Sequence, residues 1–298
     1  MYEFNRLSQV FESADQIAFD DSSRFILMSD CHRGDGSWAD DFSKNQNLYF
    51  AALTFYYDEQ YTYIELGDGD ELWENSDLCD IMREHSDAFW LLSKFIKKGR
   101  FYSLYGNHDI VKKYNGFIKN RSYQRFEKRD KEHLQLFENI KVHEGIVLKH
   151  TVTGDKIFLV HGHQADYLND RLWKLTGFLV RYLWRPLELL GVNDPTSASK
   201  NHYKKAAVEN KLIEWVKREN QMLIAGHTHR PIFPEAGAPP YFNDGSCVHP
   251  RCITGIEIAD GNITLVKWCV RTKKDGTLFV GREVLSGPRK LKNIFSSP

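Results

Sequence analysis

The sequence has no long hydrophobic run, no paired cysteine motif and no net excess of either charge. Its longest apolar stretch, residues 178–184, is interrupted by Arg181 and is far shorter than the ~20 residues that a membrane-spanning helix needs. Residues 1–19 carry acidic side chains where a secretory signal is basic, so we expect a cytoplasmic protein. The five scattered cysteines include no C-x-x-C pair, which argues against a disulfide framework and a structural zinc site.

The composition that is present is typical of a folded enzyme. The 298 residues are 42% hydrophobic and 13% aromatic, which is enough to bury a large core, and we expect one domain, residues 1–298, with insertions. Residues 1–90 contain 20 acidic and 5 basic side chains, whereas the remainder contains 20 acidic and 35 basic ones. A protein that only bound nucleic acid would carry a basic excess overall. An acid-rich region with histidines instead indicates bound metal ions.

One local pattern recurs five times: a short apolar run ends in a polar cluster. The five units are residues 25–32 (FILMSDCH), 63–68 (YIELGD), 101–109 (FYSLYGNHD), 157–163 (IFLVHGH) and 222–229 (MLIAGHTH). Helical patterns lie between them, as at 43–57 and 78–98, and alternating strands follow residue 253 with a turn at Asp260-Gly261. This order predicts an α/β layered fold. Ligands bind at the carboxyl ends of strands in such folds, so we expect the polar clusters to converge.

The side chains in these clusters are typical metal ligands. Seven of them are candidates: Asp30, His32, Asp68, Asn107, His161, His227 and His229. Carboxylate, amide and imidazole groups without thiolate favour manganese, with iron, zinc or cobalt as alternatives. Seven ligands are too many for one ion, so we expect two divalent ions that share a carboxylate and lower the pKa of a bound water. His108 is then the candidate proton donor or charge stabiliser, and Asp109 could orient its imidazole.

The blocks DCH (30–32), GDGDE (67–71), GNHD (106–109), HGH (161–163) and GHTH (226–229) resemble, in order, the five motifs of calcineurin-like metallophosphoesterases. The resemblance covers roughly residues 24–270 and implies a four-layer α/β/β/α sandwich that hydrolyses phosphodiester or pyrophosphate bonds. It implies that Asp68 bridges two ions. The first ion would also be held by Asp30, His32 and His229, and the second by Asn107, His161 and His227.

Two insertions interrupt the motifs, a basic one at 110–156 and a helical one at 164–221. The helical one has two patterns, 167–190 and 200–219. Between HGH and GHTH the chain is similar to the helical lid of bacterial UDP-2,3-diacylglucosamine pyrophosphatases, with GNHD in place of GNRD. That resemblance implies a lipid-linked nucleotide substrate and a peripheral contact with the inner face of a membrane. The alternative is that the helices form only a structural cap.

We assign tentative substrate contacts to Arg33, His163, Trp173 and Phe178. The basic stretch 112–131 supports an alternative, a nuclease or a nucleotide phosphodiesterase or phosphatase, because its charge could attract a polynucleotide. A third reading is a non-catalytic binding module. That reading predicts missing ligands, and none of the seven is missing.

Overall fold

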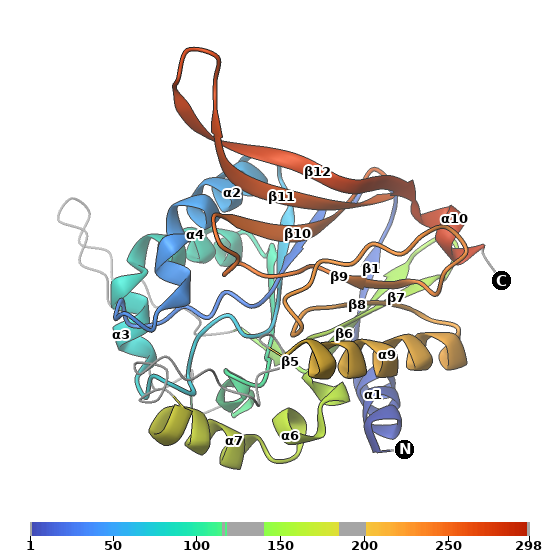
Figure 1. Ribbon diagram of the computed structural model, residues 1–298. Coiled ribbons are helices and arrows are strands. Elements are labelled where there is room, and N and C mark those ends of the chain that lie inside the picture. The colour runs from blue at the N-terminus through green and yellow to red at the C-terminus, as the bar shows by residue number, and fades with distance from the viewer. Residues whose placement is uncertain (1, 115–116, 118–139, 185–200, 297–298) are drawn as a thin grey trace.

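The computed structural model describes residues 2–114, 117, 140–184 and 201–296. Two sheets face each other in this part of the chain (Figure 1). The seven-stranded sheet has the order β12 (Leu278–Lys290), β11 (Asn262–Thr272), β10 (Cys252–Ala259), β2 (Phe25–Met28), β3 (Thr62–Leu66), β4 (Phe101–Leu104), β5 (Val142–His143). The five-stranded sheet has the order β1 (Asp15–Phe19), β6 (Gly145–His150), β7 (Lys156–Val160), β8 (Met222–Ala225), β9 (Tyr241–Asn243).

The central strands, such as β2 and β8, are apolar and buried because both faces of each sheet are covered there. In β2, Phe25 and Leu27 point into the core between the sheets, whereas Ile26 and Met28 point to the opposite face. This alternation follows from the two-residue period of a strand. The inner core therefore joins the two sheets, and each outer face needs its own helices.

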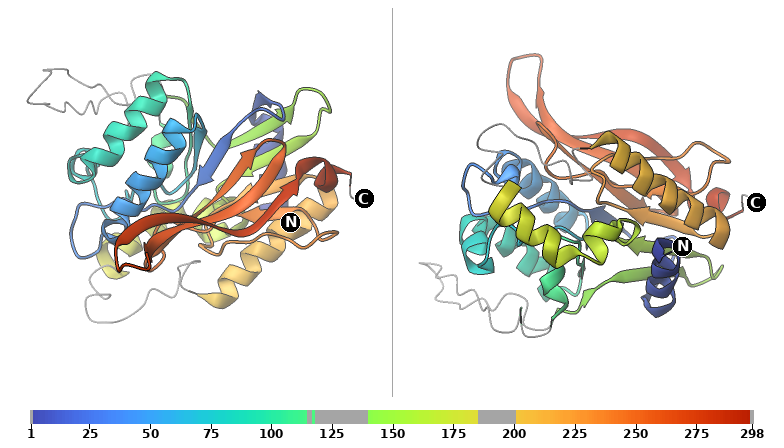
Figure 2. Two further views of the ribbon diagram at one scale, coloured as in Figure 1. Left: turned by 90° about the horizontal axis from the view of Figure 1, so that it is seen from above. Right: turned by 60° about the horizontal axis from the view of Figure 1, so that its bottom comes forward.

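Helices cover both outer faces. The outer face of the seven-stranded sheet packs against α2 (Gln46–Asp58) and α4 (Ser86–Lys97). The outer face of the five-stranded sheet packs against α1 (Tyr2–Ser13) and α9 (His202–Glu219). The layer order is α/β/β/α, which confirms the predicted sandwich, and Figure 2 shows the layers from two further sides.

One predicted helix differs from the observed structure. The pattern at 78–98 forms two helices, α3 (Leu78–Glu84) and α4, which are separated at His85. His85 is buried, and its Nε2 lies 2.7 Å from Oδ2 of Asp40, so a tertiary contact accompanies the break. The turn at Asp260-Gly261 joins β10 to β11 as predicted.

The insertions are shorter than the sequence pattern indicates. β5 and β6 lie within 110–156, so the second half of that range belongs to the sheets, and most of the basic stretch lies outside the described residues. Within 164–221, α9 buries Leu212 and Trp215 against the five-stranded sheet and is a layer of the sandwich. The segment Tyr167–Trp184 is part of neither sheet and of neither helix layer that covers a sheet, and we call it the lid. It consists of α6 (Tyr167–Asp170), α7 (Trp173–Leu179) and the π-helix η4 (Val180–Trp184); residues 185–190 of the predicted helix lie outside the described residues.

Candidate metal centre

The predicted metal ligands follow the carboxyl ends of five strands. β2, β3 and β4 are parallel neighbours in one sheet, and β7 and β8 are parallel neighbours in the other. The two sheet edges meet, because Nε2 of His161, after β7, lies 3.1 Å from Oδ2 of Asp68, after β3. Nε2 of His229, after β8, lies 3.0 Å from Oδ1 of Asp30, after β2. The polar clusters therefore converge as strand polarity predicts.

The converging side chains form two adjacent groups. One consists of Asp30, His32 and His229, and the other of Asp68, His161 and His227. Within each group the ligand-type atoms lie within 4.8 Å of one another. Nε2 of His32 also lies 3.9 Å from Oδ2 of Asp68, which connects the two groups. Asp68 therefore lies near the members of both groups, as a bridging ligand requires.

Several buried ligand atoms make no hydrogen bond of normal geometry among the described residues, although two of them, Oδ1 of Asp30 and Nε2 of His161, lie 3.0 and 3.1 Å from another ligand atom. They are Oδ1 of Asp30, Oδ1 of Asn107, Nε2 of His161 and Nε2 of His227. Leaving such groups unpaired costs roughly 1–3 kcal/mol each, and more for a charged group. Divalent cations would satisfy these oxygen and nitrogen atoms together, so the residues fit a metal centre.

The backbone of this site adopts an uncommon conformation. Positive φ angles occur at Asp30 (51°), His32 (47°), Asp68 (50°), His227 (66°) and His229 (51°). Non-glycine residues rarely adopt this region, and it persists only where the surroundings hold it. Here the backbone N–H of His32 donates to the carbonyl oxygen of Asp68 at 2.9 Å, and that of His227 donates to Oδ2 of Asp30 at 2.9 Å. The strain is thus concentrated at the ligands and held by bonds between the motifs.

Asp109 fastens two of these loops together. Its carboxylate accepts hydrogen bonds from the backbone N–H groups of Asp68, Gly69 and Gly106, at 3.3, 3.2 and 2.7 Å. Gly106 is needed at this contact, because a Cβ atom there would lie 2.2 Å from Oδ1 of Asp68. The prediction that Asp109 orients His108 does not fit this geometry. Asp109 instead holds the backbone of the loop that carries Asp68.

Glu71 has the orienting role, and the sequence analysis missed it. Its carboxylate lies 2.8 Å from Nδ1 of His108 and 2.7 Å from Nδ1 of His32. A carboxylate on one ring nitrogen fixes the orientation of an imidazole and leaves Nε2 to act. Glu71 is the last residue of the GDGDE block, three positions after Asp68, and that proximity was the available signal.

The carboxylates of the metal-free site are held in their charged form. Burial raises the pKa of Asp68, but His161 and His108 outweigh burial and lower it overall. Burial likewise raises the pKa of Asp30, and His229 and His161 lower it well below its usual range. Burial lowers the pKa of His161, yet Asp68 and Asp30 raise it to about 9. At neutral pH an incoming cation must therefore displace the proton of this imidazole.

Arg33 does not occupy the substrate position that the sequence suggested. Its side chain is 1% exposed. The Nε atom lies 2.7 Å from Oδ1 of Asp70, and Nη1 lies 2.8 Å from Oε1 of Glu65. Lys112, from the predicted basic stretch, is also buried, and its Nζ lies 2.7 Å from Oδ2 of Asp70 and 2.6 Å from Oδ2 of Asp109. These cations neutralise buried acids beside the metal ligands and are not available to a substrate.

His163 is enclosed behind the metal site. It is 0% exposed, and its ring centroid lies 5.4 Å from that of His161. With Glu144 and Asp170 it forms a further group of ligand type, but Arg6 hydrogen bonds to both of those acids. Both acids therefore already share one cation, and direct substrate contact by His163 does not fit its burial.

The lid lies beside the ligands and presents apolar side chains outward. Oδ2 of Asp166, at the start of α6, lies 3.7 Å from Nε2 of His227. Trp173 is partly buried, with its ring 5.5 Å from Nζ of Lys113, whereas Phe178 is 59% exposed. Of the two predicted lid contacts, Phe178 is therefore the more accessible.

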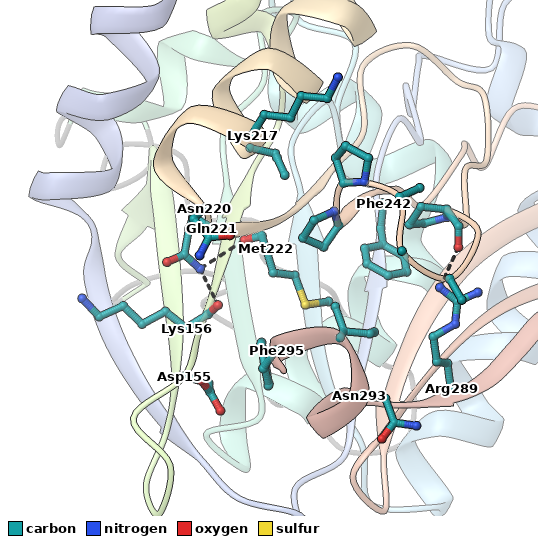
Figure 3. A pocket seen from close by; sticks show the side chains of 18 of the residues that line it. Asp155, Lys156, Lys217, Asn220, Gln221, Met222, Phe242, Arg289, Asn293 and Phe295 are labelled. Atoms are coloured by element: carbon teal, nitrogen blue, oxygen red, sulfur yellow. Dashed lines mark hydrogen bonds between the residues drawn. The ribbon is translucent and has the colours of Figure 1, made fainter. Parts of the chain in front are cut away.

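A separate hollow of about 620 Å³ lies at the opposite end of the five-stranded sheet. Figure 3 shows Lys156 and Met222, which begin β7 and β8, together with Phe242 and Phe295 around it. None of the predicted metal ligands is among the described residues that line it. This hollow is therefore separate from the ligand side chains that define the candidate site.

The chain is similar to a known protein family and to solved structures. A family profile described as calcineurin-like phosphoesterase matches residues 23–231. A conserved uncharacterised protein, a predicted phosphoesterase from Streptococcus pneumoniae TIGR4, is 14% identical, with a TM-score of 0.35 over 88% of this chain and 97% of that one. Vps29 from Chaetomium thermophilum is 12% identical, with a TM-score of 0.39 over 89% of this chain and 97% of that one. No curated protein matches the chain.

In the described part of the chain, no helix is both long and apolar enough to cross a bilayer. The family match spans more than half of the sequence and includes all five motifs. Side chains that could hold metal ions converge where the motifs meet. The chain belongs to the calcineurin-like phosphoesterase family and is a metal-dependent phosphoester hydrolase with a site for two metal ions.

Proposed function

We propose that this enzyme cleaves a phosphodiester or pyrophosphate bond of a substrate that carries an apolar chain. The hydrolytic part of the proposal rests on one observation, the buried ligand atoms without a hydrogen bond of normal geometry at Asp30, Asn107, His161 and His227. Two divalent ions, for which manganese is our proposal, would be held by these residues with His32, Asp68 and His229. When bound, they would neutralise phosphate oxygens and activate the attacking water.

The protein itself supplies proton transfer and orientation. His108 is the proposed proton donor to the leaving oxygen, because Glu71 holds its Nδ1 at 2.8 Å and its side chain stays 22% exposed. Glu71 is the charged partner that keeps this imidazole in one orientation. Burial raises the pKa of Glu71, but His108 and His32 outweigh burial and lower it, so Glu71 remains a carboxylate at neutral pH.

The proposed preference for an apolar substrate rests on the outward face of the lid. Leu172, Leu175, Phe178, Tyr182 and Leu183 are all exposed there. Exposed apolar patches of this kind mark binding surfaces, and each buried methylene of an acyl chain is worth about 0.8 kcal/mol. A nucleotide-linked acylated sugar, similar to UDP-2,3-diacylglucosamine, has both the phosphate and the chains that such a site would take.

The same face supports a proposal about location. Arg171 is exposed on the lid among these apolar side chains. Apolar and basic side chains together favour binding at the surface of an anionic bilayer. We therefore propose a cytoplasmic enzyme that contacts the inner face of a membrane through the lid.

A matched pair of substrates tests the proposal. The manganese-loaded enzyme is assayed with UDP-2,3-diacylglucosamine, its deacylated form and bis(p-nitrophenyl) phosphate. We expect hydrolysis of all three, with the highest kcat/KM for the acylated form. Equal kcat/KM for the acylated and deacylated forms would refute the apolar preference, whereas no hydrolysis of any substrate would refute the hydrolytic function. Faster turnover of single-stranded DNA than of the acylated form would favour the nuclease alternative.

A further inference from the structure

The lid is fastened to the loop that follows Glu71. The guanidinium of Arg181, in η4, donates to the carbonyl oxygen of Trp73 at 2.7 Å and to that of Leu72 at 2.8 Å, with a longer contact to Asn75 at 3.5 Å. Hydrogen bonds from a charged donor are roughly twice as strong as neutral ones. One side chain of the lid therefore satisfies several carbonyl groups of a single loop.

The same loop contacts the proposed proton donor. The ring of Trp73 lies 4.1 Å from the ring of His108, with 31° between their planes. Trp73 is buried and also lies against the lid. A Cβ atom on Gly177 would be only 3.0 Å from Cδ1 of Trp73. Gly177 thus allows α7 to approach the indole closely, and the indole is held between α7 and the imidazole.

Glu71 connects these contacts to the chemistry. It begins the loop that Arg181 holds, and its side chain contacts Nδ1 of both His108 and His32. The backbone N–H of Asn75 donates to the carbonyl oxygen of Glu71 at 3.1 Å, so residues 71–75 form a compact turn. A shift of this turn would move the carboxylate and the indole together, and both of them fix the His108 imidazole.

We propose that Arg181 is a positioning residue for catalysis, which holds residues 71–75 and thereby orients His108. Arg181 does not touch the reacting atoms in this account. The lid then has two roles, since its outer face would meet the substrate and its inner face fixes the proton donor. This inference rests on the proposed hydrolytic function, which assigns proton donation to His108.

The test compares Arg181→Met, Arg181→Lys and a control, Lys174→Met, in the manganese-loaded full-length enzyme. Lys174→Met removes the same charge from an exposed position of the neighbouring helix α7. We expect Arg181→Met to lower kcat by about 10-fold for a phosphodiester with an alkyl leaving group, and by less for bis(p-nitrophenyl) phosphate, with metal content and KM nearly unchanged. Arg181→Lys should recover part of kcat, and Lys174→Met should match the wild type.

A second measurement does not depend on activity. Hydrogen–deuterium exchange of residues 71–76, read by mass spectrometry, should be faster in Arg181→Met than in the wild type and unchanged in Lys174→Met. Wild-type kcat in Arg181→Met, or an equal loss of kcat in Lys174→Met, would overturn the inference. Unchanged exchange in Arg181→Met would also overturn it. An inactive wild type would instead refute the proposed function, and that outcome is distinguishable from the others.

Discussion

The candidate metal ligands, which we call the cradle, differ from the lid in burial and in backbone conformation. The cradle consists of Asp30, His32, Asp68, Asn107, His161, His227 and His229. Its side chains are largely buried, its backbone is strained, and hydrogen bonds between the motifs hold it. The lid has few buried residues, and its apolar side chains reach exposures such as 63% at Tyr182.

This difference separates the chemistry from the choice of substrate. A cradle formed by the ends of five strands can change little without losing its ions, because each ligand depends on the loops of its neighbours. A lid outside both layers can change its outer face without disturbing the sheets. Mutations in the cradle should therefore affect all substrates alike, whereas mutations on the outer face of the lid should affect only some.

The largest effect is expected at the bridging carboxylate. Asp68→Ala should lower kcat/KM by about 10³-fold or more for every substrate, since the loss of a bridging ligand exceeds the ~10- to 100-fold cost of an outer partner. Both ions should be lost together, because neither keeps a complete set of ligands. Metal analysis of the purified variant measures this. Retention of two ions per chain would show that Asp68 does not bridge them.

The next effect concerns the buried charged side chains beside the cradle. Lys112→Met should destabilise the metal-free protein by about 3 kcal/mol, because it removes the cation that Asp109 contacts and leaves Asp70 with Arg33 alone. Urea unfolding measures this, with the neighbouring exposed Lys113→Met as the control. Equal stability of Lys112→Met and Lys113→Met would contradict the account.

The same buried charged side chains predict that the stability of the fold depends on pH. Burial raises the pKa of Asp70, but Arg33 and Lys112 outweigh burial and lower it to about 2. This pKa is below that of the unfolded chain, ~3.9, so the contribution of Asp70 to stability is present above pH ~4 and is lost as the pH falls toward 2. Lys112→Met removes one of the two cations and should reduce this loss.

A smaller effect is expected at the proton donor. His108→Ala should lower kcat by ~10²-fold while metal content stays near that of the wild type, because His108 donates a proton and is not a ligand. The loss should be smaller for p-nitrophenyl esters, whose leaving group needs little protonation. An equal loss for good and poor leaving groups would assign His108 to stabilisation of transition-state charge instead.

The smallest and most selective effect is expected on the lid. Phe178→Asp should raise KM for an acylated substrate about 10-fold, which corresponds to ~1.4 kcal/mol, and leave bis(p-nitrophenyl) phosphate unaffected. Val152→Asp is the control, because Val152 is also an exposed apolar residue, 84% against 59% for Phe178, and lies in the turn between β6 and β7. Equal changes in KM for both substrates would make the lid a structural cap.

Local patterns were sufficient to predict the five strands that precede the motifs and the convergence of their polar clusters, but not β1, β5, β6 and β9. Each of the five strands is an apolar run that ends in a motif, and strand polarity alone brings the motifs to one place. Burial of Arg33 could not be predicted in this way, because its partners Glu65 and Asp70 are more than 30 residues away in the sequence. The helix break at His85 likewise accompanies a contact with Asp40, which no local pattern reveals.

The orienting residues show a second limit of the sequence. Glu71 stands in a quoted motif, yet only its distances to His108 and His32 reveal its role. Arg181 interrupts an apolar run, which in the sequence only argues against a membrane span. Its contact with residues 72–75 requires the packing of the lid on the sandwich.

A manganese titration of the metal-free wild-type enzyme tests the central claim most directly. Isothermal titration calorimetry counts the bound ions, and hydrolysis of bis(p-nitrophenyl) phosphate is followed in parallel. The account predicts two ions per chain, with activity rising as the second ion binds. Full activity in the metal-free enzyme, or saturation at one ion per chain, would contradict it.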